Sequence, residues 1–303
     1  TGFIYSTMKD YGIFEGVYPC IDTLELAHVL YSDTLKKFNL GHLAKSLKVE
    51  VEQLHRAIHD ARTTNNVFMR MLGDLQERNI TNYSELNSLI NVDELSKLSI
   101  PRHINLLIKN KTGLKNFYKI LSDANTTHFN KEPRMLRSVI EEYREGILVG
   151  SGCVNGEIWR NAFEKTEEDI EKVLEFYDYI EVQPPVEYLH LFRTDEDETD
   201  ALNKIKETIE KIVRVGAKHN KIVVATGDVH HLIKEDAKYR NIYLSVPRPS
   251  GGGPHELASC GRTLDMHFRS TTEMLDEFDF LPAEIAHEII VTNTNIIADM
   301  IEE

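Results

Sequence analysis

The sequence predicts an α/β protein built from parallel β/α units. Short apolar runs alternate with longer amphipathic stretches between residues 103 and 225, and this alternation is typical of parallel sheets and barrels. The run Val223–Ala225 is followed by Thr226 and Gly227, and then by Asp228 and His230. In α/β barrels, functional sites are formed by polar residues that come directly after a buried strand.

The chain changes character near residue 92. Residues 1–90 carry apolar residues at helical spacing and are predicted to be mostly helical. After that point we expect four strands, at His103–Ile108, Ile147–Val149, Tyr179–Val182 and Ile222–Ala225, and three helices, at Leu114–Leu121, Leu136–Tyr143 and Ala201–His219. The acidic stretch 195–200 is expected to be a solvated loop that caps the last of these helices.

Composition limits the classes of function. A length of 303 residues suits one barrel-sized domain or two smaller ones. The net charge of −14 argues against a broad basic surface that grips a phosphate backbone. Three widely spaced cysteines exclude a disulfide scaffold and fit a reducing compartment. No signal peptide and no long apolar run is present, so we expect a cytoplasmic protein without membrane association.

Asp228 and His230 form the first candidate site. In an extended segment, residues two apart point the same way, so these two side chains can bind one metal ion together. A hydrogen-bonded Asp–His pair without metal is the alternative.

His55 and Asp60 form the second candidate site. Five positions along a helix turn through about 500°, so the two side chains converge only if His55 lies on the turn before the helix. A carboxylate could then hold a divalent metal while the imidazole deprotonates a water. An ordinary helix start with a surface histidine is the alternative.

Several motifs resemble PolC-type DNA polymerase III alpha subunits. Asp22–Leu26 followed by His55–Ala61 resembles the end of a DEDDh 3′–5′ exonuclease. The motifs at Lys111–Lys119, Arg144–Cys153, Tyr179–Pro185, Ala225–His230 and Thr272–Phe278 resemble the PHP (polymerase and histidinol phosphatase) domain. The resemblance implies a helical remnant of an RNase H-like exonuclease over residues 1–90. It also implies the C-terminal part of a distorted (β/α) barrel of PHP type over residues 91–303.

The resemblance also assigns roles to single residues. His55 is similar to the general base of the exonuclease, and Asp60 to its metal-binding carboxylate, which would hold Mg or Mn. In the PHP part, Cys153, Asp228 and His230 match metal ligands, and such ligands permit Zn, Mn or Fe.

Not every position fits the family pattern. The family has a histidine where this chain has Asn125, and His128 follows three residues later. Either His128 replaces that ligand through a shifted loop, or the site is degenerate. His103 either lines the same cleft or is a hydrogen-bonded core residue. His190, His255 and His267 fit no motif and are expected to be surface or structural residues.

The leading hypothesis is therefore a fragment of a replicative bacterial DNA polymerase. The whole protein would synthesise DNA on a template and proofread it, with primer–template DNA and replisome subunits such as a sliding clamp as partners. By the resemblance, further metal-binding carboxylates precede Thr1 and the polymerase palm follows Glu303, so the piece alone is expected to lack complete exonuclease and polymerase sites. A free-standing PHP-type phosphoesterase and a structural module with a vestigial metal site are the alternatives.

Overall fold

The computed structural model describes residues 21–51, 57–82, 85–86, 89, 101–130, 132–192, 194–247, 253–261 and 264–302. Through these residues the chain forms two compact units. Within the described residues, unit 1 lies in 102–118 and 143–302, and unit 2 lies in 21–101 and 119–142. Helix α6 (Lys111–Asn125) begins in unit 1 and ends in unit 2.

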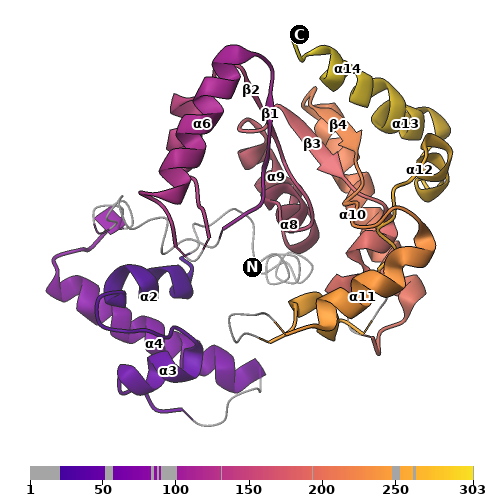
Figure 1. Ribbon diagram of the computed structural model, residues 1–303. Helices are drawn as coiled ribbons and strands as arrows, with labels where there is room; N and C mark the ends of the chain where they lie inside the picture. The colour runs from indigo at the N-terminus through magenta and orange to yellow at the C-terminus, as the bar shows by residue number, and fades with distance from the viewer. Residues whose placement is uncertain are drawn as a thin grey trace. The chain divides into compact units, whose positions relative to one another are not determined.

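Unit 2 is helical in its described part (Figure 1), in agreement with the spacing of its apolar residues. Its helices are α2 (Thr23–Tyr31), α3 (Leu40–Ser46), α4 (Ala57–Glu77) and α7 (Arg137–Glu142). Asp22 and Asn39 accept hydrogen bonds from main-chain N–H groups in the first turns of α2 and α3, which stabilises these helix starts. The apolar faces of α2, α3 and α4 form one core, with Leu30, Leu43 and Met71 among its buried residues.

Unit 1 contains a four-stranded sheet in the described residues. Its strands follow the order β1 (Asn105–Ile108), β2 (Ile147–Gly150), β3 (Tyr179–Val182) and β4 (Ile222–Ala225). All four expected strands are confirmed. Strands β2, β3 and β4 are parallel, whereas β1 pairs with β2 in the antiparallel direction. The expectation of uniformly parallel strands was therefore wrong for β1, because a short apolar run carries no signal for its direction.

Helices cover both faces of this sheet. Leu148, Tyr179 and Val224 lie on one face and pack against Ile297 of α14 (Asn293–Asp299). On the other face, α10 (Glu198–Lys218) packs its Gly216 against Val223 and Ile180. The two faces alternate along β3 and β4 because successive residues of a strand point in opposite directions. Figure 1 shows α14 beside β4 in this layered arrangement.

Helix α10 confirms the expected cap, because the Asp197 carboxylate accepts hydrogen bonds from Thr199 N and Asp200 N. The other elements of unit 1 are α8 (Glu157–Glu164), α9 (Glu167–Leu174), η3 (Pro185–Leu191), η4 (Lys234–Asp236), α11 (Ala237–Ser245), η5 (Glu256–Ser259), α12 (Thr271–Glu277), α13 (Ala283–His287) and the π-helical turn η6 (Glu288–Thr292). No helix in the described ranges is long and apolar enough to cross a membrane.

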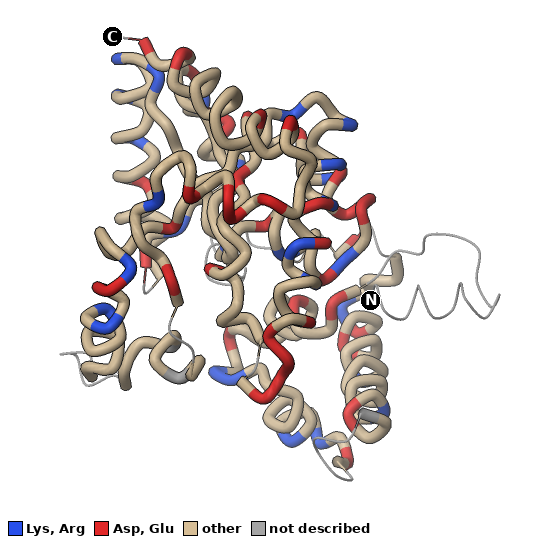
Figure 2. The backbone as a smooth tube through the Cα atoms, turned by 90° about the vertical axis from the view of Figure 1, so that its right-hand side faces the viewer, with Lys and Arg blue, Asp and Glu red and all other residues tan. Residues whose placement is uncertain are grey.

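The described strands form an open mixed sheet, so an α/β fold is confirmed in this coarse form. Closure into a distorted barrel and the RNase H-like character of unit 2 remain predictions. Figure 2 shows basic and acidic residues interspersed along the described chain, and not separated into one basic and one acidic stretch.

Candidate metal site at the carboxyl edge of the sheet

The candidate residues of unit 1 lie at one edge of the sheet. Cys153 follows the carboxyl end of β2, and Asp228 follows that of β4. Because β1 is antiparallel to β2, it is the start of β1 that reaches this edge, with His103 just before it. We call these three residues together with His230 the strand-edge site. The antiparallel strand β1 thus places His103 at the same edge at which the parallel strands β2 and β4 place Cys153 and Asp228.

Asp228 and His230 converge as the extended-segment argument predicts. His230 Nε2 lies 3.3 Å from Asp228 Oδ1, and the two side chains are 45% and 42% exposed. The main chain fixes both residues, since Asp228 N donates to Glu187 Oε2 (3.0 Å) and His230 N donates to Met266 O (2.9 Å). Burial lowers the pKa of His230, and the nearby Arg240 charge lowers it further. A neutral imidazole beside a carboxylate is a suitable pair of donors for a borderline divalent metal.

Cys153 and His103 form a second pair. The Cys153 sulfur lies 3.3 Å from His103 Nδ1. Gly152 permits this approach, because its φ is +71° and a Cβ there would lie 2.9 Å from His103 O. Burial raises the pKa of the Cys153 thiol, and the charges of Asp228 and Glu181 act in the same direction. The exposed His103 is thus a polar neighbour of Cys153 at the strand-edge site, and not a core residue.

Glu181 connects three strand ends and was missed by the sequence patterns. Its buried carboxylate accepts hydrogen bonds from Asn105 Nδ2 at 2.8 and 2.9 Å, from Gly152 N at 3.3 Å and from Thr226 Oγ1 at 3.2 Å. Burial raises the pKa of Glu181, and the bond from Asn105 opposes that shift. The available signal was a glutamate inside the apolar strand Tyr179–Val182, since such a residue is almost never buried unless it is paired.

A second buried carboxylate, that of Glu187, holds the main chain at Asp228. Glu187 accepts from Asp228 N and forms a 2.7 Å ion pair with Arg269, and both side chains of this pair are almost fully buried. Arg269 also binds Glu277 through its Nε at 2.9 Å. Burial nevertheless raises the pKa of Glu187 to about 7. Sequence spacing gave no indication of this pair, because its members are far apart in the chain.

The remaining predicted residues belong to unit 2 or fall outside the described residues. His55 lies outside them. Asp60 lies in the first turn of α4 (Ala57–Glu77), and its role remains a prediction. His128 is buried, with Nδ1 2.6 Å from Asp123 Oδ2. Asn125 Nδ2 donates to Leu121 O at 2.7 Å. Through the described residues, no group of three or more His, Cys, Asp or Glu side chains is arranged to hold a metal.

Comparison with known proteins shows similarity along the whole chain. Residues 43–185 match the PHP domain family. All 303 residues align at 42% identity with the DNA polymerase III PolC-type of Halalkalibacterium halodurans, covering 20% of that protein. The same PolC-type protein of Bacillus subtilis is 42% identical over 290 residues, or 94% of this chain and 19% of its own length. Along its whole length, the chain is therefore similar to part of PolC-type DNA polymerase III.

The chain spans about a fifth of the length of these relatives. The PolC-type protein of Staphylococcus aureus gives the same proportion, with 36% identity over 301 residues and 20% of its length covered. The PHP match begins at residue 43, before the predicted domain boundary near residue 90. That boundary remains a prediction.

Proposed function

We propose that this chain is the PHP-containing part of a replicative bacterial polymerase. The whole protein would synthesise DNA on a primer–template in the cytoplasm, proofread it in the 3′–5′ direction and act with replisome subunits such as a sliding clamp. The observation that carries the proposal is the alignment with PolC-type DNA polymerase III along the entire chain. A primer-extension assay on the full-length polymerase tests it, and absence of template-directed synthesis would contradict it.

The strand-edge site would hold a divalent metal as an accessory of that polymerase. The support is geometric: Asp228 and His230 present an oxygen and a nitrogen donor 3.3 Å apart. Cys153, held beside His103, would add a thiolate, and metal binding requires loss of its proton. Three donors do not complete a tetrahedral site, so at least one further ligand would have to join them. The donor types suit Zn, Mn or Fe.

Metal content measured by mass spectrometry tests this site, with a matched control in the same unit. His219 Nε2 at the end of α10 lies 3.1 Å from Glu171 Oε1 of α9, so it is a similar carboxylate–imidazole pair outside the strand-edge site. We expect Asp228→Ala and His230→Ala to lose the bound metal and His219→Ala to keep it. Equal metal content in all three variants would contradict a strand-edge metal.

The helices of unit 2 would complete the proofreading exonuclease, with Asp60 as a metal ligand and His55 as the general base. The position of Asp60 in the first turn of α4 supports this proposal. In the full-length polymerase, we expect His55→Ala to slow 3′–5′ degradation by about 10² to 10⁴-fold, the usual contribution of a general base. The 303-residue chain alone should show no such activity, and robust Mg²⁺-dependent degradation of a primer end would contradict this.

Hydrolysis of a phosphate ester at the strand-edge site is a second candidate function. Arg160 Nε and Arg240 Nη1 are buried atoms without a hydrogen-bond partner in the described structure. The charges of Asp228 and Glu187 both act on Arg240, so a cation with a spare donor lies near the candidate metal pair. Arginine is well suited to bind phosphate oxygens. Mn²⁺-dependent hydrolysis of p-nitrophenyl phosphate that is lost in Arg240→Met would favour this function, and absence of hydrolysis would leave the metal a structural role.

A further inference from the structure

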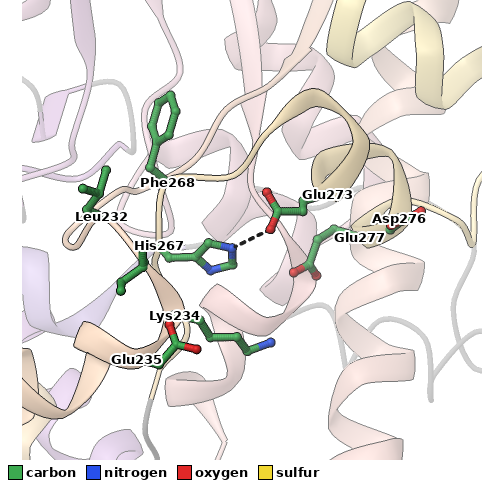
Figure 3. Close-up of a pocket in the computed structure, with 9 residues that line it drawn as sticks. Leu232, Lys234, Glu235, His267, Phe268, Glu273, Asp276 and Glu277 are labelled. Atoms are coloured by element: carbon green, nitrogen blue, oxygen red, sulfur yellow. Dashed lines mark ion pairs between the residues drawn. The ribbon is translucent and has the colours of Figure 1, made fainter.

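A pocket of about 670 Å³ opens beside the strand-edge site, on unit 1. It is lined by Leu232, Ile233, Lys234 and Glu235 from one segment and by His267, Phe268, Glu273, Asp276 and Glu277 from another. We call it the α12 pocket, because α12 supplies its three last-named residues. Figure 3 shows Leu232 and Phe268 on one side of His267 and these three acidic residues on the other.

Main-chain hydrogen bonds hold the two segments together. His230 N donates to Met266 O at 2.9 Å, and Phe268 N donates to His231 O at 3.0 Å. The His231 ring joins them as well, since its Nε2 accepts from Met266 N at 3.2 Å. At the floor, His267 Nδ1 lies 2.6 Å from Asp265 Oδ1. The pocket is therefore a preformed feature whose walls do not depend on a bound molecule.

The apolar wall is unusually exposed. Leu232 is 70% exposed, Ile233 51% and Phe268 64%. A single exposed apolar residue is ordinary, but a group of them around one hollow is typical of an interaction site. A small polar molecule would leave these side chains in water, whereas a polypeptide segment would cover them.

The pocket lining is also acidic. Four of the lining residues are carboxylates, against one ammonium, that of Lys234. Lys234 is already paired with Asp265 at 3.0 Å, and Glu277 is paired with the buried Arg269. No ion pair joins Glu235 or Asp276 to another described residue, and both are exposed. A ligand with a positive charge would therefore meet two carboxylates that have no cationic partner within the described chain.

We propose that the α12 pocket is a docking site for a basic, apolar-flanked segment of the polymerase chain outside these 303 residues. The segment presents basic residues to Glu235 and to Asp276 and packs apolar neighbours on Leu232 and Phe268. The inference rests on the proposed function, because the aligned relatives are about five times as long as this chain. A polymerase as long as these relatives contains further chain that could occupy the pocket. The charge and apolar character of the pocket walls define the chemistry of that segment.

Hydrogen exchange of the full-length polymerase tests the docking site. The readout is the exchange rate of the main-chain amides in 232–235 and 266–270, which line or adjoin the pocket. We expect the double variant Glu235→Lys, Asp276→Lys to exchange these amides at least tenfold faster than the parent chain. Phe268→Ser is expected to have a similar effect through loss of the apolar contact.

Glu210→Lys is the matched control, because Glu210 is an exposed carboxylate on α10 that does not line the pocket. It should leave the exchange of the two segments unchanged, and amides in the middle of α10 report that every variant is folded. Equal exchange in the parent and the double variant would overturn the proposal. Protection that depends on protein concentration would also overturn it, because the occupant would then be a second copy. Failure of the full-length chain in primer extension would contradict the proposed function, and the exchange result is independent of that assay.

Discussion

Glu187 combines two opposing influences on a single buried carboxyl group. Burial disfavours its charged form, while the Arg269 guanidinium 2.7 Å away favours it. Burial is the stronger influence, since it raises the pKa of Glu187 from 4.5 to about 7. The folded state therefore keeps a proton that the unfolded state has already released between these two pH values. A group of this kind stabilises the fold below pH 4.5 and loses that contribution as the pH rises towards 7.

We expect the wild-type free energy of unfolding to fall between pH 5 and 8 relative to that of Glu187→Gln, by about 2 to 3 kcal/mol. Glutamine has nearly the same shape and still accepts hydrogen bonds, but it does not titrate. Urea unfolding at several pH values measures the free energy of unfolding of both proteins. Subtracting one from the other cancels the contributions of the titratable groups that the two proteins share. Parallel curves for the two proteins would show that Glu187 is ionised throughout this range.

The sequence predicted those site residues whose geometry is local. The Asp228 and His230 side chains converge because alternate residues of an extended segment share a direction, and this rule needs no knowledge of the fold. The roles of Glu181 and Glu187 could not be predicted, because each depends on burial by segments distant in the chain. Likewise, His267 fits no motif, and its place in the α12 pocket follows from the pairing of two segments.

At the level of elements, the start of α6 passes very close to the turn before β2. A Cβ added to Gly113 would lie 1.8 Å from Gly146 O, a main-chain atom that cannot rotate away. We expect Gly113→Ala to lower the free energy of unfolding by about 3 kcal/mol or more. Gly73→Ala is the control, because a Cβ there meets nothing within 4 Å. It should stabilise helix α4 by up to about 1 kcal/mol, and similar effects of the two changes in urea unfolding would disprove the close approach.

Helix α12 depends on a reciprocal cap at its first turn. Ser270 Oγ accepts from Glu273 N at 3.3 Å, and Glu273 Oε2 accepts from Ser270 N at 2.7 Å. We expect Ser270→Ala to cost about 1 kcal/mol, and Ser270→Thr to cost much less because it keeps the hydroxyl. Thermal unfolding of both variants measures this. An unchanged midpoint for Ser270→Ala would mean that the cap does not contribute to stability.

The positions of the strands were predictable, but the direction of one strand was not. The runs Tyr179–Val182 and Ile222–Ala225 coincide with β3 and β4, because buried parallel strands are continuous apolar segments bounded by polar turns. β1 has the same kind of sequence and the opposite direction. Direction depends on the path of the connection that follows a strand, which the local pattern does not contain.

For the molecule as a whole, the net charge of −14 makes a prediction about DNA. We expect the 303-residue chain alone to bind duplex DNA no more tightly than roughly 10⁻⁴ M at physiological salt, the weak end of non-specific binding. Fluorescence anisotropy with a labelled duplex measures this dissociation constant. A chelator in the buffer excludes contacts between protein and DNA that a metal ion mediates. A dissociation constant below about 10⁻⁶ M would reveal a basic surface that the overall charge conceals.

The division into units was also only partly accessible from the sequence. The helical pattern of the first ninety residues agrees with α2, α3 and α4, but residues 119–142 join the same compact unit. Their helical periodicity is no different from that of helices in unit 1. Membership of a unit is decided by long-range packing, so local periodicity cannot assign it.

Because β1 is antiparallel to β2, the connection between these strands is longer than their pairing requires. Parallel neighbours require a long crossover, whereas antiparallel neighbours need only a tight turn. β1 and β2 are antiparallel, yet residues 109–146 separate them. Geometry does not demand this excursion, and residues 119–142 within it belong to unit 2. During evolution, the length of this connection could therefore change, and part of it could pack in another unit. The order and register of the sheet would stay the same.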